Sequence, residues 1–163
     1  MTSSATNAAK APPHSESTDT YVQDTVRWLE RAIIGLNLCP FAKSVHVKGQ
    51  IHHVVTLATT AEDVLAALRE ELQGLANAPA EVRDTTLVVV PHCLHDFLDF
   101  NDFLGDVEDV VHDMGLEGTL QVASFHPQFQ FAGTDPDDVT NCTNRAPYPT
   151  LHLLREASID RAV

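Results

Sequence analysis

Residues 86–90, Thr-Leu-Val-Val-Val, form an apolar and β-branched run near the middle of the chain. A strand that is apolar on both faces belongs inside a sheet whose two faces are covered. The segments 51–57 and 120–125 are also rich in β-branched and apolar residues, and they predict two further strands. The chain therefore needs helices or other layers on both sides of its sheet.

Helices are expected between and around these strands, because apolar residues recur there at helical spacing. They are predicted over 21–37, after the N-cap Thr60, over 94–114, and from Pro147 or Pro149 to about residue 159. Strands separated by helices predict βαβ units with right-handed crossovers. The expected fold is α/β, a single small layered domain with a mostly parallel sheet of three to four strands flanked by helices. The strand order is not readable.

The domain is expected to span 20–163, and residues 1–19 are expected to form a disordered tail, since they are rich in Ala, Ser, Thr and Pro. The formal net charge is −13, which repels phosphate backbones and anionic membranes, so neither nucleic acid nor membrane is an expected partner. The N-terminus lacks the apolar core of a secretory signal, and a cytoplasmic location is expected. The oligomeric state is not indicated.

Two histidines follow expected strands, His126 directly after 120–125 and His92 one residue after 86–90. Ligands of parallel α/β sheets sit beyond the carboxyl ends of the strands. Two imidazoles in one such crevice can act as acid and base near neutral pH, so His126 and His92 are the candidate catalytic residues. The alternative is that each ring simply hydrogen-bonds loop carbonyls.

A polar segment before the last expected helix offers amide and guanidinium donors to an anion. The candidate ligand-binding residues are Asn141, Asn144, Arg145, His152 and Arg155. The last two share one face of the expected helix, as positions i and i+3 do. In the alternative interpretation, the asparagines form turns, Arg145 pairs with a surface acid, and the helix face is solvated.

The three cysteines show no C-x-x-C spacing, so neither a disulfide framework nor a zinc knuckle is predicted, and no metal ligand is assigned. Cys39 precedes Pro40, and Cys93 adjoins His92, so both are candidate reactive thiols. The alternative for each is a small buried hydrophobe. No cofactor is indicated.

Long motifs in the chain resemble a bacterial domain-of-unknown-function family numbered 1415. They comprise 35–42 (Gly-Leu-Asn-Leu-Cys-Pro-Phe-Ala), Asp96-Phe97 with 100–104, 121–133 and 144–158. The resemblance runs from about Trp28 to Val163. It implies no established activity, cofactor or ligand, and so no functional residues are carried over from it. Phe129 and Ala146 stand where the family pattern has Tyr and Ser.

The leading hypothesis is an uncharacterised cytoplasmic enzyme that acts on a small anionic metabolite. His126 and His92 would supply acid and base, and Arg145 would anchor the anion. One alternative is a non-catalytic ligand-binding or protein-interaction domain. A second alternative is a metal-dependent, hydrolase-type site formed by His92, His126 and a carboxylate. The sequence does not indicate a substrate or a reaction.

Overall fold

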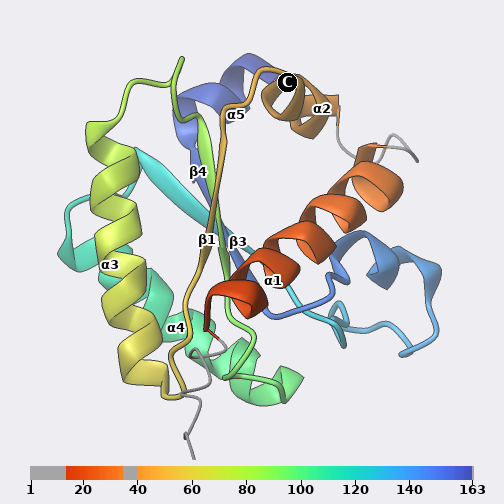
Figure 1. The fold of residues 1–163 in the computed structure, drawn as a ribbon. Helices are drawn as coiled ribbons and strands as arrows, with labels where there is room; N and C mark the ends of the chain where they lie inside the picture. Colours follow the sequence, from red (N-terminus) through yellow and green to blue (C-terminus); the bar gives the residue numbers. More distant parts are fainter. Residues whose placement is uncertain (1–13, 35–39, 163) are drawn as a thin grey trace, which may run out of the picture.

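The computed structural model describes residues 14–34 and 40–162 of the chain. Its helices are α1 (His14–Trp28), α2 (Pro40–Val47), α3 (Ala61–Asn77), α4 (Phe97–Asp113) and α5 (Glu156–Ala162). A π-helix, η1 (Leu29–Ile34), continues α1, and a 3₁₀-helix, η2 (Val139–Asn144), lies in the longest loop. The strands are β1 (Ile51–Val55), β2 (Thr85–Val89), β3 (Leu120–Phe125) and β4 (Thr150–Arg155), and Figure 1 shows their arrangement.

The strands form one sheet with the order β1-β2-β4-β3. β1 pairs with β2 in parallel, whereas β4 is antiparallel to both β2 and β3. The α/β class is confirmed, but the sheet is mixed rather than mostly parallel. The difference arises because β4 enters between β2 and β3 from the long loop and runs against both of them.

Residues 150–155 form β4, so the helix predicted over this segment is wrong. Leu151 and Leu153 are buried on one face of the sheet, and Thr150 and His152 lie on the other, as the two-residue period of a strand requires. Pairing with strands on both sides gives the β4 backbone its hydrogen bonds. His152 and Arg155 therefore lie on opposite faces of a strand instead of sharing a helix face.

Helices α3 and α4 cover one face of the sheet and form the main core with it. Thr60 caps α3 as predicted, because its side chain accepts a hydrogen bond from the Asp63 N–H at 3.3 Å. The buried side chains between the two helices and the sheet include Val64, Leu68, Leu72, Phe100, Phe103 and Val107. Truncating one such leucine to alanine costs about 2–5 kcal/mol of stability.

Helix α1 and η1 cross the other face of the sheet (Figure 1). Leu29 and Ile33 are buried there, and the Trp28 ring meets the Phe125 ring of β3 with centroids 5.1 Å apart. α1 begins at His14, seven residues before the predicted start of the helix at residue 21. The first thirteen positions of the expected tail lie outside the described residues.

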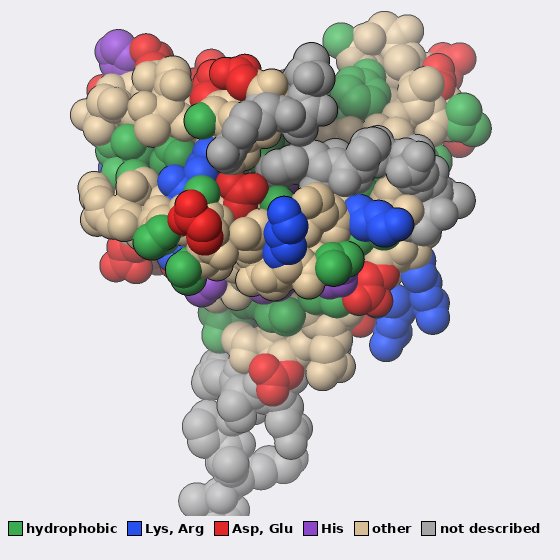
Figure 2. Space-filling view, turned by 90° about the horizontal axis from the view of Figure 1, so that it is seen from above, with side chains coloured by type: hydrophobic (Ala, Val, Ile, Leu, Met, Phe, Trp, Pro, Cys, Tyr) green, Lys and Arg blue, Asp and Glu red, His purple; other side chains and the backbone are tan. Residues whose placement is uncertain are grey.

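β1, β2 and β3 point the same way, so their carboxyl ends meet at one end of the sheet. The loop 90–96 and the loop 126–149 leave from this end, and β4 starts there. Figure 2 looks onto the opposite end, near α2 and α5, where acidic and basic side chains are interspersed. None of the described helices is long and apolar enough to cross a membrane.

Candidate functional site

His126 follows β3 directly and is fully buried, with 0% of its surface exposed. Its Nδ1 accepts a hydrogen bond from the Gln128 N–H at 3.0 Å, so the ring proton sits on Nε2, which donates to the Leu94 carbonyl at 3.0 Å. Burial lowers the pKa of His126 and keeps the ring neutral. Both ring nitrogens are therefore engaged by the protein itself.

The carbonyl that accepts this bond belongs to a strained turn between β2 and α4. Leu94 has a φ of +62°, in the left-handed region that side chains such as leucine rarely adopt. Two residues later, Asp96 caps α4 by accepting a hydrogen bond from the Asp99 N–H at 3.0 Å. The bond from His126 thus joins the loop after β3 to the turn that starts α4, and helps to hold that turn in its conformation.

Asn141 and Asn144 shape the long loop from within. Asn141 is fully buried; its Oδ1 accepts from the Phe131 N–H at 2.8 Å, and its Nδ2 donates to the Asp135 carbonyl at 3.0 Å. Asn144 donates from Nδ2 to the Ser124 carbonyl at 3.0 Å, and its own carbonyl accepts from the His126 N–H at 3.0 Å. Asn141 therefore holds the loop together internally, and Asn144 positions the loop against β3.

Arg145, next to Asn144, is oriented by backbone carbonyls. Its Nε donates to the Phe129 carbonyl at 3.0 Å, and one terminal nitrogen, Nη2, donates to the Pro136 carbonyl at 2.6 Å. Among the described side chains, Arg145 forms no ion pair. The carbonyls fix the direction of the guanidinium, and its positive charge has no carboxylate partner in the described part of the chain.

Arg145 lines an open groove of about 540 Å³ between the start of α4 and the loop after β3. The apolar walls are formed by Phe97, Leu98, Pro127 and Pro136. The other polar lining residues are Asp96, Gln128, Gln130 and Asp137. Pockets of roughly 300–1,000 Å³ with apolar walls and a few polar groups hold small molecules in proteins.

Local sequence patterns do not predict most of these lining residues as part of a site. Phe97 and Leu98 stand in an apolar helical pattern, which indicates core packing and gives no sign of a groove. Gln128 and Gln130 alternate with aromatic residues after His126, and this alternation is the only local signal for these two positions. The groove forms because α4 and the long loop meet in space, far apart in sequence.

His92 is exposed and does not line the groove. Its ring meets Tyr21 edge-on with centroids 5.6 Å apart, and Tyr21 in turn meets Tyr148 at 4.9 Å. The Tyr148 hydroxyl donates to Oδ2 of Asp24 at 2.5 Å. Burial, and then the hydrogen bond to Asp24, raise the pKa of Tyr148 to about 12. This cluster attaches α1 to the turn before β4, a contact that no local sequence pattern indicates.

His152 and Arg155 also lie outside the groove. The Thr85 hydroxyl donates to the Leu153 carbonyl at 2.6 Å, so it accepts from Nε2 of His152 at 2.7 Å, and burial lowers the pKa of His152 to about 4. At the other end of β4, Nη2 of Arg155 donates to three carbonyls, those of Leu75 (2.9 Å), Ala78 (2.6 Å) and Arg83 (2.8 Å). Arg155 therefore joins the end of α3 to the start of β2.

Of the two candidate thiols, only Cys93 lies within the described residues. Cys39 lies outside the described residues, and Cys93 is half-buried and packs against the main core. Cys142, in η2, is exposed.

Within the described ranges, no three His, Cys, Asp or Glu side chains are grouped so that they could hold a metal ion, so the metal-dependent hypothesis has no supporting cluster in that part of the chain.

A family model described as "Protein of unknown function (DUF1415)" matches residues 20–163. No curated protein and no solved structure matches the chain.

Proposed function

The chain belongs to the DUF1415 family, and we propose that it is a ligand-binding domain whose groove takes a small molecule with an anionic group at Arg145. The observation that carries this proposal is the orientation of the Arg145 guanidinium. Two carbonyls orient it, and no carboxylate among the described residues forms an ion pair with it. A planar guanidinium keeps further N–H donors for a carboxylate or a phosphate.

The other walls of the groove fit the rest of such a molecule. Phe97, Leu98 and Pro127 offer apolar surface, and the amide of Gln128 offers both a donor and an acceptor. Asp96 and Asp137 also line the groove, so a ligand that carries an ammonium group beside its anionic group is favoured over a polyanion. The groove therefore suits a small amphipathic molecule with one carboxylate or phosphate.

The geometry supports binding more than catalysis. A catalytic base must reach the proton that it removes, and both nitrogens of His126 are already hydrogen-bonded inside the protein. His92 is exposed but contacts Tyr21 outside the groove. The catalytic role of the two histidines stays a prediction from sequence, whereas His126 has a clear structural role in holding the groove's two walls together.

A ligand screen followed by calorimetric titration tests the proposal. Monocarboxylates, amino acids and phosphate monoesters are screened by thermal shift, because a ligand that binds the native state raises the unfolding midpoint. Arg145→Gln should weaken the best hit by roughly tenfold or more, as expected for losing a charge-assisted hydrogen bond. Arg145→Lys should retain part of the affinity.

Arg69→Gln is the matched control, because Arg69 is exposed on α3 and away from the groove. It removes the same charge and should leave the affinity unchanged. If Arg145→Gln folds and binds the hit as tightly as the Arg69→Gln protein does, the proposed anchor is wrong.

A further inference from the structure

β3 is an edge strand, because the sheet order places it after β4 with no strand beyond it in the described chain. Its backbone groups alternate between β4 and the open side. The Glu156 N–H donates to the Thr119 carbonyl, whereas the Ser124 carbonyl accepts from the Asn144 side chain outside the sheet. This alternation points the N–H and C=O of Val122 away from β4, toward the open edge.

The open part of this edge is short. At one end, the Leu120 N–H already donates to the Leu116 carbonyl, at 3.0 Å. At the other end, Nδ2 of Asn144 donates a hydrogen bond to the Ser124 carbonyl at 3.0 Å. The N–H and C=O of Val122 lie between these ends and point to the open edge, and the Leu120 carbonyl and the Ser124 N–H lie beside them. An added strand would pair over about three residues here.

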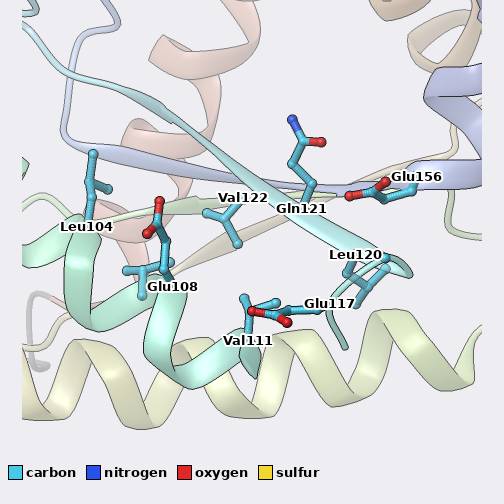
Figure 3. Close-up of a pocket in the computed structure, with 10 residues that line it drawn as sticks. Leu104, Glu108, Val111, Glu117, Leu120, Gln121, Val122 and Glu156 are labelled. Atoms are coloured by element: carbon cyan, nitrogen blue, oxygen red, sulfur yellow. The ribbon is translucent and has the colours of Figure 1, made fainter. Parts of the chain in front are cut away.

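A cavity of about 300 Å³ lies beside this edge, between β3 and α4 (Figure 3). Leu104, Val107 and Val111 of α4 form its apolar floor with Leu120 and Val122 of β3. In Figure 3 the Leu120 and Val122 side chains point toward α4, and Gln121 points away from it. An extended chain along β3 would therefore place alternate side chains at the cavity.

Three carboxylates surround the cavity: Glu108 of α4, Glu117 of the loop before β3, and Glu156 at the start of α5. Glu117 contacts Nδ1 of exposed His112 at 3.1 Å. Within the described part of the chain, Glu108 and Glu156 form no ion pair. A lysine or arginine side chain matches this arrangement, since its aliphatic stem packs on apolar surface and its charged head reaches the rim.

We propose that the β3 edge and this cavity form a docking site for an extended peptide segment of a partner protein that carries a lysine or arginine. The peptide backbone pairs with Val122, which extends the sheet by one strand. Its basic side chain enters the cavity, where the stem contacts Leu104 and Val107 and the charged head lies among the glutamates. The backbone supplies affinity, and the cavity supplies the preference for a basic residue.

A second copy of this chain fits the edge less well. Pairing two β3 edges would place the carboxylates of both cavities, those of Glu108, Glu117 and Glu156, along one interface. Each copy also carries a net charge of −13, and like charges across an interface oppose association. Charge therefore favours a basic peptide over self-association.

Fluorescence polarisation with the full chain and a labelled, capped peptide, Val-Thr-Lys-Thr-Val, tests the proposal. The lysine peptide should bind in low salt, the same peptide with glutamate in the middle should not, and methylating the backbone nitrogens of the lysine peptide should abolish binding. Glu108→Gln and Glu156→Gln should each weaken binding by roughly two- to fivefold, the range for exposed ion pairs. Glu70→Gln, an exposed charge on α3, should leave it unchanged.

Val122→Pro removes the outward N–H, and proline is tolerated at such positions of edge strands. Circular dichroism should show that this variant folds, and the variant should no longer bind the lysine peptide. The methylated peptide provides the same test if the variant fails to fold, because it leaves the protein unchanged. Three results would each overturn the proposal. The lysine and glutamate peptides could bind equally, or neither could bind. The chain could also form a dimer that Val122→Pro dissociates.

Discussion

Nε2 of His126 donates a hydrogen bond to the carbonyl of Leu94 at 3.0 Å, and Leu94 holds a φ of +62°. This pair connects the ends of two strands that are not neighbours in the sheet, β2 and β3. The turn that contains Leu94 starts α4, and the loop that contains His126 leads to Arg145. Both walls of the groove therefore depend on this bond for their relative position.

Replacing His126 should destabilise the protein strongly. His126→Ala leaves a cavity between Phe97 and Phe100 and removes the partners of the Leu94 carbonyl and the Gln128 N–H. The expected loss is about 2–4 kcal/mol in urea unfolding. His92→Ala is the control: it removes an exposed ring and should cost under about 1.5 kcal/mol. Similar losses for the two variants would contradict the structural role of His126.

The left-handed conformation of Leu94 gives a second prediction. Glycine adopts a positive φ without strain, so Leu94→Gly regains about 1–2 kcal/mol that offsets part of its lost packing. Leu116 is also half-buried against the main core, and its φ is not positive. Leu94→Gly should therefore destabilise less than Leu116→Gly in urea unfolding. A larger loss at Leu94 would show that strain in this turn is small.

The stability of the fold should fall as the solution becomes acidic. The pKa of His152 is about 4 in the folded protein, below its ordinary value of 6.5. Between these values the unfolded chain binds a proton that the folded chain does not, so unfolding becomes easier as the pH falls from 6.5 toward 4. Burial lowers the pKa of His126 and of His53 too, which adds in the same direction.

Urea unfolding at several pH values checks this prediction. The slope should approach roughly 1.4 kcal/mol per pH unit for each proton taken up. His152→Gln keeps a donor for Thr85 and should reduce the slope between pH 6.5 and 4. If the variant has the same pH dependence as the wild type, His152 is not the main titrating group.

Arg155 should contribute to stability without affecting the groove. Arg155→Ala leaves the carbonyls of Leu75, Ala78 and Arg83 without their shared donor, and also removes a weak ion pair with Asp84. The expected loss is about 2–4 kcal/mol, measured by urea unfolding. Arg69→Ala, at an exposed position of α3, should change stability by less than about 0.5 kcal/mol. Ligand affinity that changes with Arg155 and not with Arg145 would point to a site at the other end of the sheet.

Elements with a strong local pattern could be predicted from the sequence. α3 has a capping threonine and a continuous apolar stripe, and β2 is apolar on both faces, so neither depends on distant residues for its signal. Leu151 and Leu154 are three residues apart and prolines precede them, so the local pattern predicts a helix where β4 lies. Its strand conformation depends on pairing with β2 and β3, which no local pattern contains.

For the candidate site too, local patterns place the residues in the chain but do not give their distant partners. Placing His126 at the end of a strand and Arg145 in the loop that follows was possible from local patterns, and the structure has them there. The partners of these residues could not be predicted. The bond from His126 goes to Leu94, and the groove wall opposite Arg145 includes Phe97, so both depend on how two loops meet in space.

The most direct test of the central claim is to map the bound ligand by nuclear magnetic resonance. With the best anionic hit at saturation, the Nε–H signal of Arg145 and the backbone amides of Phe97, Gln128 and Gln130 should shift most, because these residues line the groove. Arg145→Gln should remove these shifts at the same ligand concentration. Shifts concentrated at His92, Tyr21 and Tyr148 instead, with the groove signals unmoved, would contradict the claim.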